Sequence, residues 1–312
     1  MHIRNVIIDC DTGVDDALAL LLALRSPTLD VIGITCVAGN VDIDKVVRNT
    51  LVTVEHAGKK VPVYRGASGP LLCPLETAAY AHGQDGLGNI GFPPPSGREA
   101  AEHAVDFLVE TYMQATQPVL LITQAPLTNI ALALLKEPRL AERIPAMVMM
   151  AGGIDGGNVT AAAEFNVWVD PEAADIVFRS PIPKTMVALD PIREGGTLEE
   201  SDIAAIEQSG APWCQMAARL ARWQMGRRWA AKISPPDLAA MAVAIDPSIA
   251  QSEMYHVAIE TQGRHTRGMT VVDRRPFRRL REGLPEPNVN TVTAIDNLRF
   301  RRLVTDTWRV QQ

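Results

Sequence analysis

The sequence predicts an α/β protein with a doubly wound, mostly parallel central sheet and helices on both faces. In the first half of the chain, short apolar runs alternate with helical patterns, as they do in βαβ units. The runs are apolar throughout, which is typical of strands that are buried on both faces. With 312 residues, 47% of them hydrophobic, the chain is long enough to bury a large core.

The elements follow in chain order. We expect strands within residues 6–8, 31–37, 119–122 and 147–150, and helices within residues 17–24, 43–56 and 127–135. The stretch 212–245 also has a helical pattern, broken at Ser234-Pro235-Pro236. We expect this stretch, together with the residues before it from about 199, to form a helical cap over the carboxyl ends of the strands (about residues 199–245). Since no linker interrupts the chain, residues 1–312 are predicted to form one domain.

Composition indicates a small-molecule partner. The net charge of −6 combines intermixed signs, so neither a nucleic acid nor an anionic membrane is expected as a partner. No run approaches the roughly 20 apolar residues of a membrane span, and residues 1–5 do not resemble a signal peptide, which predicts a cytoplasmic protein. The cysteines lack metal-like spacing and are predicted to be reduced, buried thiols: Cys10, Cys36, Cys73 and Cys214.

An acidic motif directly follows the first predicted strand. Residues 9–16 contain Asp9, Asp11, Asp15 and Asp16, and an apolar helix begins at once. So much like charge beside a core is costly unless a cation compensates it. Ca²⁺ takes about six to eight oxygen ligands and would suit this cluster, which falls where α/β sheets bind ligands. Helix capping is the alternative, but it accounts for only one or two of the four acids.

The same motif resembles a known family. Residues 9–17, Asp-Cys-Asp-Thr-Gly-Val-Asp-Asp-Ala, are similar to the D-x-D-P-G-x-D-D-A signature of the inosine-uridine-preferring nucleoside hydrolases. Further similar segments follow in the family's order at residues 37–40, 82–83, 125–131, 157–158, 163–166, 170–174 and 260–263. The resemblance implies calcium-dependent hydrolysis of the N-glycosidic bond of ribonucleosides. It also implies a homodimer or homotetramer.

Roles carry over residue by residue. By resemblance, Asp11 is the general base and a metal ligand, Asp16 and Asp237 are further carboxylate ligands, and the carbonyl of Gln124 completes the metal shell. The family usually has T-G-P-L-T-N at this place, and this chain has Ala125 at the position of the glycine. Recognition of the ribose is expected from a polar set with one methionine: Asp15, Asn40, Met150, Asn158, Glu164 and Asn166.

The sequence deviates from the family at the residue expected to assist departure of the base. Many members have a histidine, and others a tryptophan, directly before the metal aspartate, and this chain has Pro236, which donates no proton. His82 matches the family's other pocket histidine and is the candidate catalytic acid. Three residues of the predicted cap are expected to contact the base: Trp223, Arg228 and Trp229. For the two tryptophans, core packing is an alternative.

Two other functions stay open at the level of sequence. Residues 9–12 superficially fit the D-x-D-x-T motif of haloacid-dehalogenase-type phosphatases, although Gly13 stands where that motif expects threonine or valine. Alternatively, a pocket that lacks an acid at Pro236 predicts a catalytically weak or silent nucleoside- or ribose-binding protein. The sequence decides neither the preferred base nor the oligomeric state.

Overall fold

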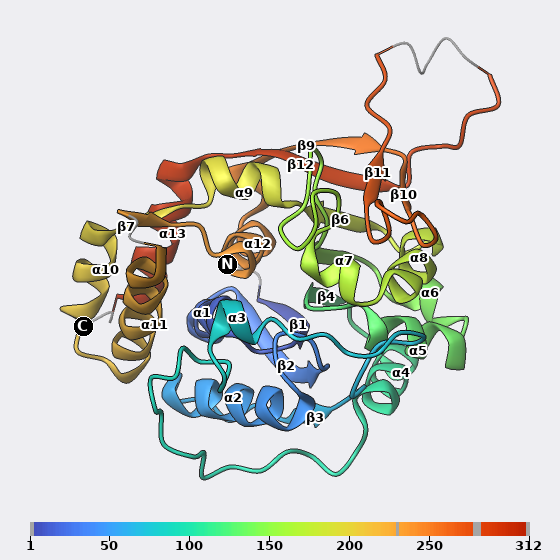
Figure 1. Ribbon diagram of the computed structural model, residues 1–312. Helices are drawn as coiled ribbons and strands as arrows, with labels where there is room; N and C mark the ends of the chain where they lie inside the picture. Colours follow the sequence, from blue (N-terminus) through green and yellow to red (C-terminus); the bar gives the residue numbers. More distant parts are fainter. Residues whose placement is uncertain (1–2, 229–230, 277–281, 310–312) are drawn as a thin grey trace.

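A computed structural model describes residues 3–228, 231–276 and 282–309 of the chain (Figure 1). An eight-stranded sheet has the order β3-β2-β1-β4-β5-β6-β12-β9. All neighbouring strands in it are parallel except β9, which pairs antiparallel with β12 at one edge. The strands are β1 (Arg4–Cys10), β2 (Leu29–Cys36), β3 (Val63–Arg65), β4 (Val119–Gln124), β5 (Met147–Met150), β6 (Lys184–Val187), β9 (Ala250–Tyr255) and β12 (Val289–Ile295).

Helices cover both faces of this sheet, which confirms the predicted doubly wound α/β fold (Figure 1). Side chains alternate along β1, so Val6 and Ile8 pack into one hydrophobic core and Ile7 into the other. The first core is formed with α1 (Val14–Arg25), α2 (Ile43–His56), α11 (Pro212–Arg228), α12 (Pro236–Ile245) and α13 (Asn297–Trp308). The second is formed with α4 (Ala104–Gln114), α5 (Thr128–Lys136) and α8 (Pro171–Arg179).

Shorter elements complete the chain. The helices are α3 (Ala79–His82), α6 (Leu140–Arg143), α7 (Phe165–Val169), α9 (Leu189–Gly195), α10 (Glu200–Glu207) and a 3₁₀ turn at Pro247–Ile249. Two small antiparallel pairs lie outside the main sheet: β7 (Leu198–Glu199) with β8 (Lys232–Ile233), and β10 (Val257–Ile259) with β11 (Thr270–Val272).

The strand register brings several polar loops together at the carboxyl ends of the central strands. Cys10, the last residue of β1, is level with Cys36 of β2 on one side and with Gln124 of β4 on the other. Because these strands are parallel, the segments that follow them all start at the same edge. The acidic motif therefore lies beside the turn after β2 and the end of β4.

Part of the predicted cap is a core helix. α12 is buried from Asp237 to Ala244 and packs mainly on α1. Its sequence is apolar on every side, which suits a helix that is surrounded by protein. Only the part of the expected cap that precedes it, α10 and α11, packs farther from the sheet, and the C-terminal end of α11 reaches the site described below. The expected break lies at Ser234 and Pro235, directly before α12, which begins with Pro236.

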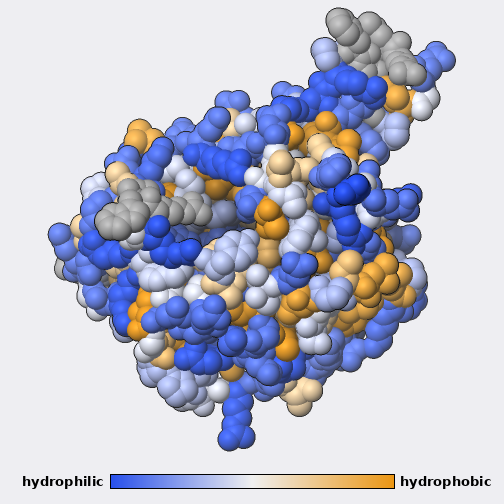
Figure 2. All heavy atoms as spheres, viewed as in Figure 1, coloured by the Kyte–Doolittle hydropathy of each residue, from blue (hydrophilic) through white to orange (hydrophobic). Residues whose placement is uncertain are grey.

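Cysteine burial differs from the prediction at one position. Cys10, Cys36 and Cys214 are free and buried, whereas Cys73 is free but partly exposed. Cys73 lies in the irregular segment before α3, where its sulfur accepts a hydrogen bond from the Arg267 guanidinium at 3.0 Å. Figure 2 shows a face on which hydrophilic side chains predominate. Among the described residues, no helix has the length and apolar character needed to cross a membrane.

Candidate active site

The acidic motif forms the turn between β1 and α1. The chain leaves β1 at Cys10 and enters α1 at Val14, and the N–H of Gly13 donates to Asp16 Oδ2 at 2.9 Å. Acidic side chains in the first turn are favoured by the positive end of the helix dipole. A Cβ at Gly13 would collide with the His82 ring, so only glycine allows these two segments to approach.

Asn40 connects two carboxylates of the motif. Its backbone N–H donates to Asp11 Oδ2 at 2.7 Å. Its side-chain amide donates to Asp11 Oδ1 at 3.1 Å and to Asp16 Oδ2 at 2.9 Å. Both oxygens of Asp11 are therefore oriented from the turn after β2.

Three carboxylates meet at the edge of the sheet. Oxygens of Asp15, Asp16 and Asp237 all lie within 4.8 Å of one another, and all three residues are buried. Asp237 reaches this place because α12 begins there. Asp11 is not one of the three. We call Asp15, Asp16 and Asp237 the carboxylate triad.

Unsatisfied oxygens beside the triad fit a hard cation. Among the described residues, Asp15 Oδ1 and Gln124 Oε1 are buried and have no hydrogen-bond partner. The Gln124 amide nitrogen donates to Asp16 Oδ1 at 3.2 Å, which orients this side chain toward the triad. Buried polar atoms normally have partners, and carboxylate and amide oxygens are the ligands that Ca²⁺ prefers. The triad and its surroundings therefore offer oxygen atoms of the right kind for a divalent ion.

The pKa values of the clustered carboxyl groups also favour a bound cation. Burial, and then the charge of Asp16, raises the pKa of Asp11 well above its ordinary value. Burial, and then the charge of Asp16, also raises the pKa of Asp237 well above the usual range. Burial, and then the charge of Asp15, raises the pKa of Asp16 to about 7. A bound cation would reverse these shifts because it favours the ionised carboxylates.

A cavity of about 70 Å³ lies against the triad. Asp11 and Asp16 are buried and do not line it. It brings together most of the residues predicted to bind substrate or to act in catalysis, with Pro236 and several neighbours. Its walls are Asp15, Asn40, Ala78, Tyr80, Ala81, His82, Gln124, Met150, Asn158, Glu164, Phe165, Asn166, Pro236 and Asp237.

Glu164 orders one wall of this cavity. It caps α7, and its oxygens accept from the N–H groups of Asn166 at 2.9 Å and Gly152 at 2.8 Å. Burial raises the pKa of Glu164 to about 7, although backbone N–H groups act in the other direction. The Asn166 amide donates to the carbonyl of Met150 at 3.1 Å, and Asn158 Oδ1 accepts from Phe165 N–H at 2.9 Å. The wall is thus fixed by hydrogen bonds between its own members.

A second cavity, of about 280 Å³, adjoins the first. The two share Asp15, Tyr80, Ala81, His82, Asn158 and Pro236, and residues of α11 and of the strand β8 region close the second cavity on its outer side. Those residues are Trp223, Gln224, Arg227, Ile233 and Ser234.

The second cavity contains one of the predicted base contacts and a basic residue that was not predicted. Trp223 lines it as expected, and among the described side chains of its wall the basic one is Arg227. Arg227 lies four residues after Trp223 and therefore on the same face of α11. Trp229 and the side chain of Arg228 lie outside what the structure describes. Tyr80 was not predicted, because an irregular loop places it and no periodic pattern reveals it.

His82 lies where the two cavities meet. Its Nδ1 accepts a hydrogen bond from the N–H of Val14 at 3.1 Å and lies 3.4 Å from Asp15 Oδ1. The backbone carbonyl of His82 accepts from Gly88 N–H at 2.8 Å. Because Nδ1 accepts an N–H, the proton of the neutral ring is on Nε2.

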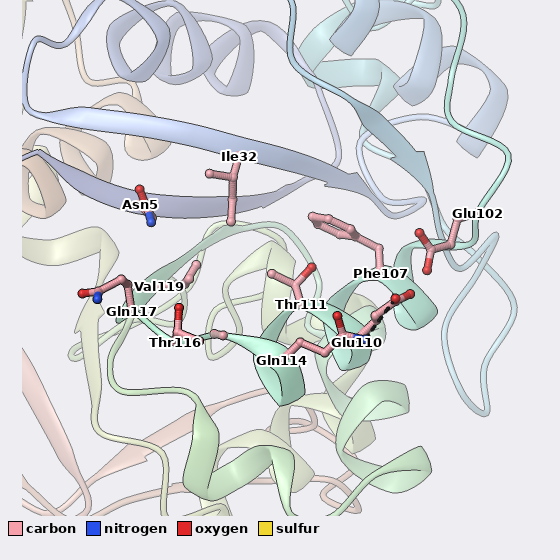
Figure 3. Close-up of a pocket in the computed structure, with 11 residues that line it drawn as sticks. Asn5, Ile32, Glu102, Phe107, Glu110, Thr111, Gln114, Thr116, Gln117 and Val119 are labelled. Atoms are coloured by element: carbon pink, nitrogen blue, oxygen red, sulfur yellow. Dashed lines mark hydrogen bonds between the residues drawn. The ribbon is translucent and has the colours of Figure 1, made fainter.

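A further pocket, of about 520 Å³, lies beside the amino-terminal ends of β1 and β4 (Figure 3). It is lined by Asn5 near the start of β1, Val119 at the start of β4, and side chains of α4, and it contains none of the predicted site residues. Ligands of parallel α/β sheets bind at the carboxyl ends of the strands, so the two adjoining cavities are the candidate active site.

Comparison with known proteins agrees with this architecture. Residues 6–302 match the family described as inosine-uridine preferring nucleoside hydrolase. The chain is 42% identical over 277 residues to the pyrimidine-specific ribonucleoside hydrolase RihA of Photobacterium profundum, covering 87% of this chain and 89% of the relative. It is 39% identical over 314 residues to RihA of Shewanella baltica, covering 98% of this chain and 96% of the relative.

Solved structures give the same result. A plant nucleoside hydrolase, the PpNRh1 enzyme, superposes with a TM-score of 0.90 at 28% identity, covering 98% of this chain and 99% of that one. The purine-preferring ribonucleoside hydrolase from Gardnerella vaginalis superposes with a TM-score of 0.89 at 30% identity, covering 98% of both chains. This chain therefore belongs to the inosine-uridine preferring nucleoside hydrolase family and is a nucleoside hydrolase acting on ribonucleosides. The phosphatase and binding-protein alternatives are set aside.

Proposed function

We propose that this enzyme hydrolyses pyrimidine ribonucleosides in a calcium-dependent reaction, with ribose in the first cavity and the base in the second. The observation that carries this proposal is the junction of the two cavities beside the carboxylate triad, at Asp15, His82 and Asn158. A glycosidic bond that crosses this junction lies next to carboxylates on its sugar side. The pyrimidine preference is drawn from the RihA relatives, which are named pyrimidine-specific.

Ca²⁺ would be held by oxygen atoms from three segments. By resemblance these are Asp11, Asp16, Asp237 and the carbonyl of Gln124, and the position of Asp15 in the carboxylate triad adds a further carboxylate nearby. When bound, the ion acidifies a coordinated water and orients ribose hydroxyls. The partnerless buried oxygens of Asp15 and Gln124 support a cation at this place.

Asp11 is the proposed general base. Its carboxylate is oriented by two donors of Asn40, so one geometry is maintained for accepting a proton from the attacking water. Cleavage builds positive charge on the ribose, as in glycoside hydrolysis generally. The buried carboxylates Asp15, Asp16 and Glu164 supply negative potential for that charge.

Sugar selectivity tests the placement of the ribose. We expect 2′-deoxyuridine to be hydrolysed at least about 10²-fold more slowly than uridine, because a missing hydroxyl leaves buried polar groups without partners. Release of reducing sugar from a panel of nucleosides, with phosphate esters as controls, measures both activity and selectivity. Equal kcat/KM for the two sugars would contradict the assignment of Asp15, Asn158 and Asn166 to the ribose.

His82 is the proposed donor to the departing base. We expect His82→Ala to lower kcat/KM for uridine by roughly 10²-fold and to change hydrolysis of 4-nitrophenyl riboside only a few-fold, since nitrophenolate leaves without a donated proton. Steady-state kinetics on both substrates provide the measurement. Equal losses on both would assign His82 to structure instead.

Three further expectations from the sequence stay predictions: a cytoplasmic location, a homodimer or homotetramer, and a single domain. Light scattering on the purified enzyme measures the oligomeric state. A single domain predicts one cooperative thermal transition.

A further inference from the structure

Arg227 places a guanidinium in the wall of the second cavity. Its Nη1 donates to the carbonyl of Ala81 at 2.6 Å, and the guanidinium lies 5.1 Å from the centre of the Trp223 ring. No carboxylate of the described residues forms an ion pair with Arg227. A guanidinium has five N–H groups, so one hydrogen bond to Ala81 leaves others for a ligand in the cavity.

The position of Arg227 is maintained by a row of side chains on α11. Arg219, Trp223 and Arg227 are spaced four residues apart; Arg227 contacts α3, and the other two contact the segment that follows it. Arg219 donates to the carbonyl of Ile90 at 3.3 Å, and Trp223 packs so closely on Gly88 that a Cβ there would lie 2.7 Å from the ring. Among the described side chains that line the cavity, Arg227, at the C-terminal end of this row, is the one that contributes a cation.

The site needs a group that accommodates negative charge on the departing base. When the N-glycosidic bond breaks, its electron pair goes to the base. Pro236 lacks a proton to donate, and the Nδ1 of His82 already accepts from Val14. A neutral histidine offers one N–H at Nε2, which makes a hydrogen bond but carries no charge. A fixed cation in the wall of the base cavity compensates for charge that a neutral donor leaves on the base.

We infer that Arg227 is a catalytic residue that stabilises the base as an anion, by donating to the carbonyl oxygen bonded beside the glycosidic nitrogen. The water oxygen bonds to C1′, a water proton passes to Asp11, and the C1′–N electron pair delocalises onto that carbonyl. His82 donates a hydrogen bond to the departing base from Nε2–H, and solvent protonates the base after it has left. Pyrimidines carry such a carbonyl next to the glycosidic nitrogen and purines do not, so Arg227 selects pyrimidine ribonucleosides. This inference rests on the proposed function, because it assumes that the base occupies the second cavity.

Paired substrates and matched variants test it. Uridine needs charge stabilisation at the base, whereas 4-nitrophenyl riboside releases a phenolate that spreads its own charge onto the nitro group. Arg227→Gln is compared with Arg219→Gln, which also removes a hydrogen bond from an arginine of α11 to a backbone carbonyl but lies outside the cavity. We expect Arg227→Gln to lower kcat/KM for uridine by about 10²–10³-fold. Its effect on the nitrophenyl riboside is expected to be a few-fold, as is that of Arg219→Gln on either substrate.

Chemical rescue separates charge from structure. We expect guanidinium chloride, at concentrations that leave the fold intact by circular dichroism, to restore part of the uridine activity of Arg227→Ala and none of its nitrophenyl riboside activity. Equal losses on both substrates without rescue, or no loss on uridine, would overturn the inference while leaving the proposed function standing. If the unmodified enzyme releases ribose from neither substrate with calcium present, the proposed function itself fails.

Discussion

Replacing Asp11 by asparagine is expected to lower kcat for uridine by about 10²–10⁴-fold, because loss of a general base alone has an effect of that size. The substitution keeps the shape of the side chain, and Asn40 can still donate to the remaining oxygen. The fold should therefore persist. Single-turnover or steady-state kinetics measure the loss, and circular dichroism with thermal unfolding measures the fold.

A matched control comes from a carboxylate outside the site. Asp42 caps α2 through a hydrogen bond from Lys45 N–H at 3.0 Å, and it lines neither of the two cavities. Asp42→Asn should leave kcat within about two-fold of the unmodified enzyme, since a surface substitution changes stability by only a few tenths of a kcal/mol. Activity of Asp11→Asn within tenfold of this control would mean that another group activates the water.

Removal of calcium is expected to abolish activity, and readdition should restore it. The triad and Asp11 are buried together, and without a cation their charges repel one another. Calcium at about 100 times its Kd adds about 2.7 kcal/mol to the free energy of unfolding. For a chain of this size the Tm should rise by roughly 4 °C. Differential scanning calorimetry and metal analysis of the purified protein provide the measurement.

This stabilisation should depend on pH in a defined direction. In the calcium-free protein, burial and like charge raise the pKa of Asp16 to about 7 and those of Asp11 and Asp237 well above the usual range. A carboxyl whose pKa is higher in the folded than in the unfolded state stabilises the fold at low pH, and that contribution is lost as pH rises through the folded value. The calcium-free Tm should thus fall between about pH 5 and about pH 8, and calcium should raise Tm more at the higher pH. Full activity after exhaustive chelation, or a Tm that calcium leaves unchanged at both pH values, would contradict the metal site.

The sequence predicted the edge of the sheet more successfully than it predicted side-chain directions. Because parallel strands end on the same side of a sheet, the placement of the acidic motif at the carboxyl ends of the strands was predicted from the apolar runs. The hydrogen bonds between Asp11 and Asn40 required the structure. Side-chain direction on a helix is harder to predict, because one residue turns a side chain by about 100°; Arg227, which lines the second cavity, was not among the predicted base contacts. Gln124 was expected to act through its backbone, and only packing reveals that its side chain also faces Asp16.

Long-range placement was the other limit. Asp237 reaches the carboxylate triad because α12 is buried against α1, and a pattern read as a cap did not predict a core helix. Tyr80 depends on an irregular loop, for which hydrophobic periodicity carries no information. The resemblance to a family supplied the order of the site residues, whereas their spatial arrangement required the fold.

The segment between His82 and Ile90 is constrained by backbone geometry more than by ligand chemistry. Gly83, Gly86, Gly88 and Asn89 have φ values of 84°, 80°, 73° and 53°, a region that side chains other than glycine and asparagine rarely occupy. None of these four residues lines either cavity. Few substitutions should therefore be tolerated in residues 83–89, even among enzymes that cleave different bases. Changes of specificity should arise instead on α11, where side chains can be exchanged without altering the backbone of this turn.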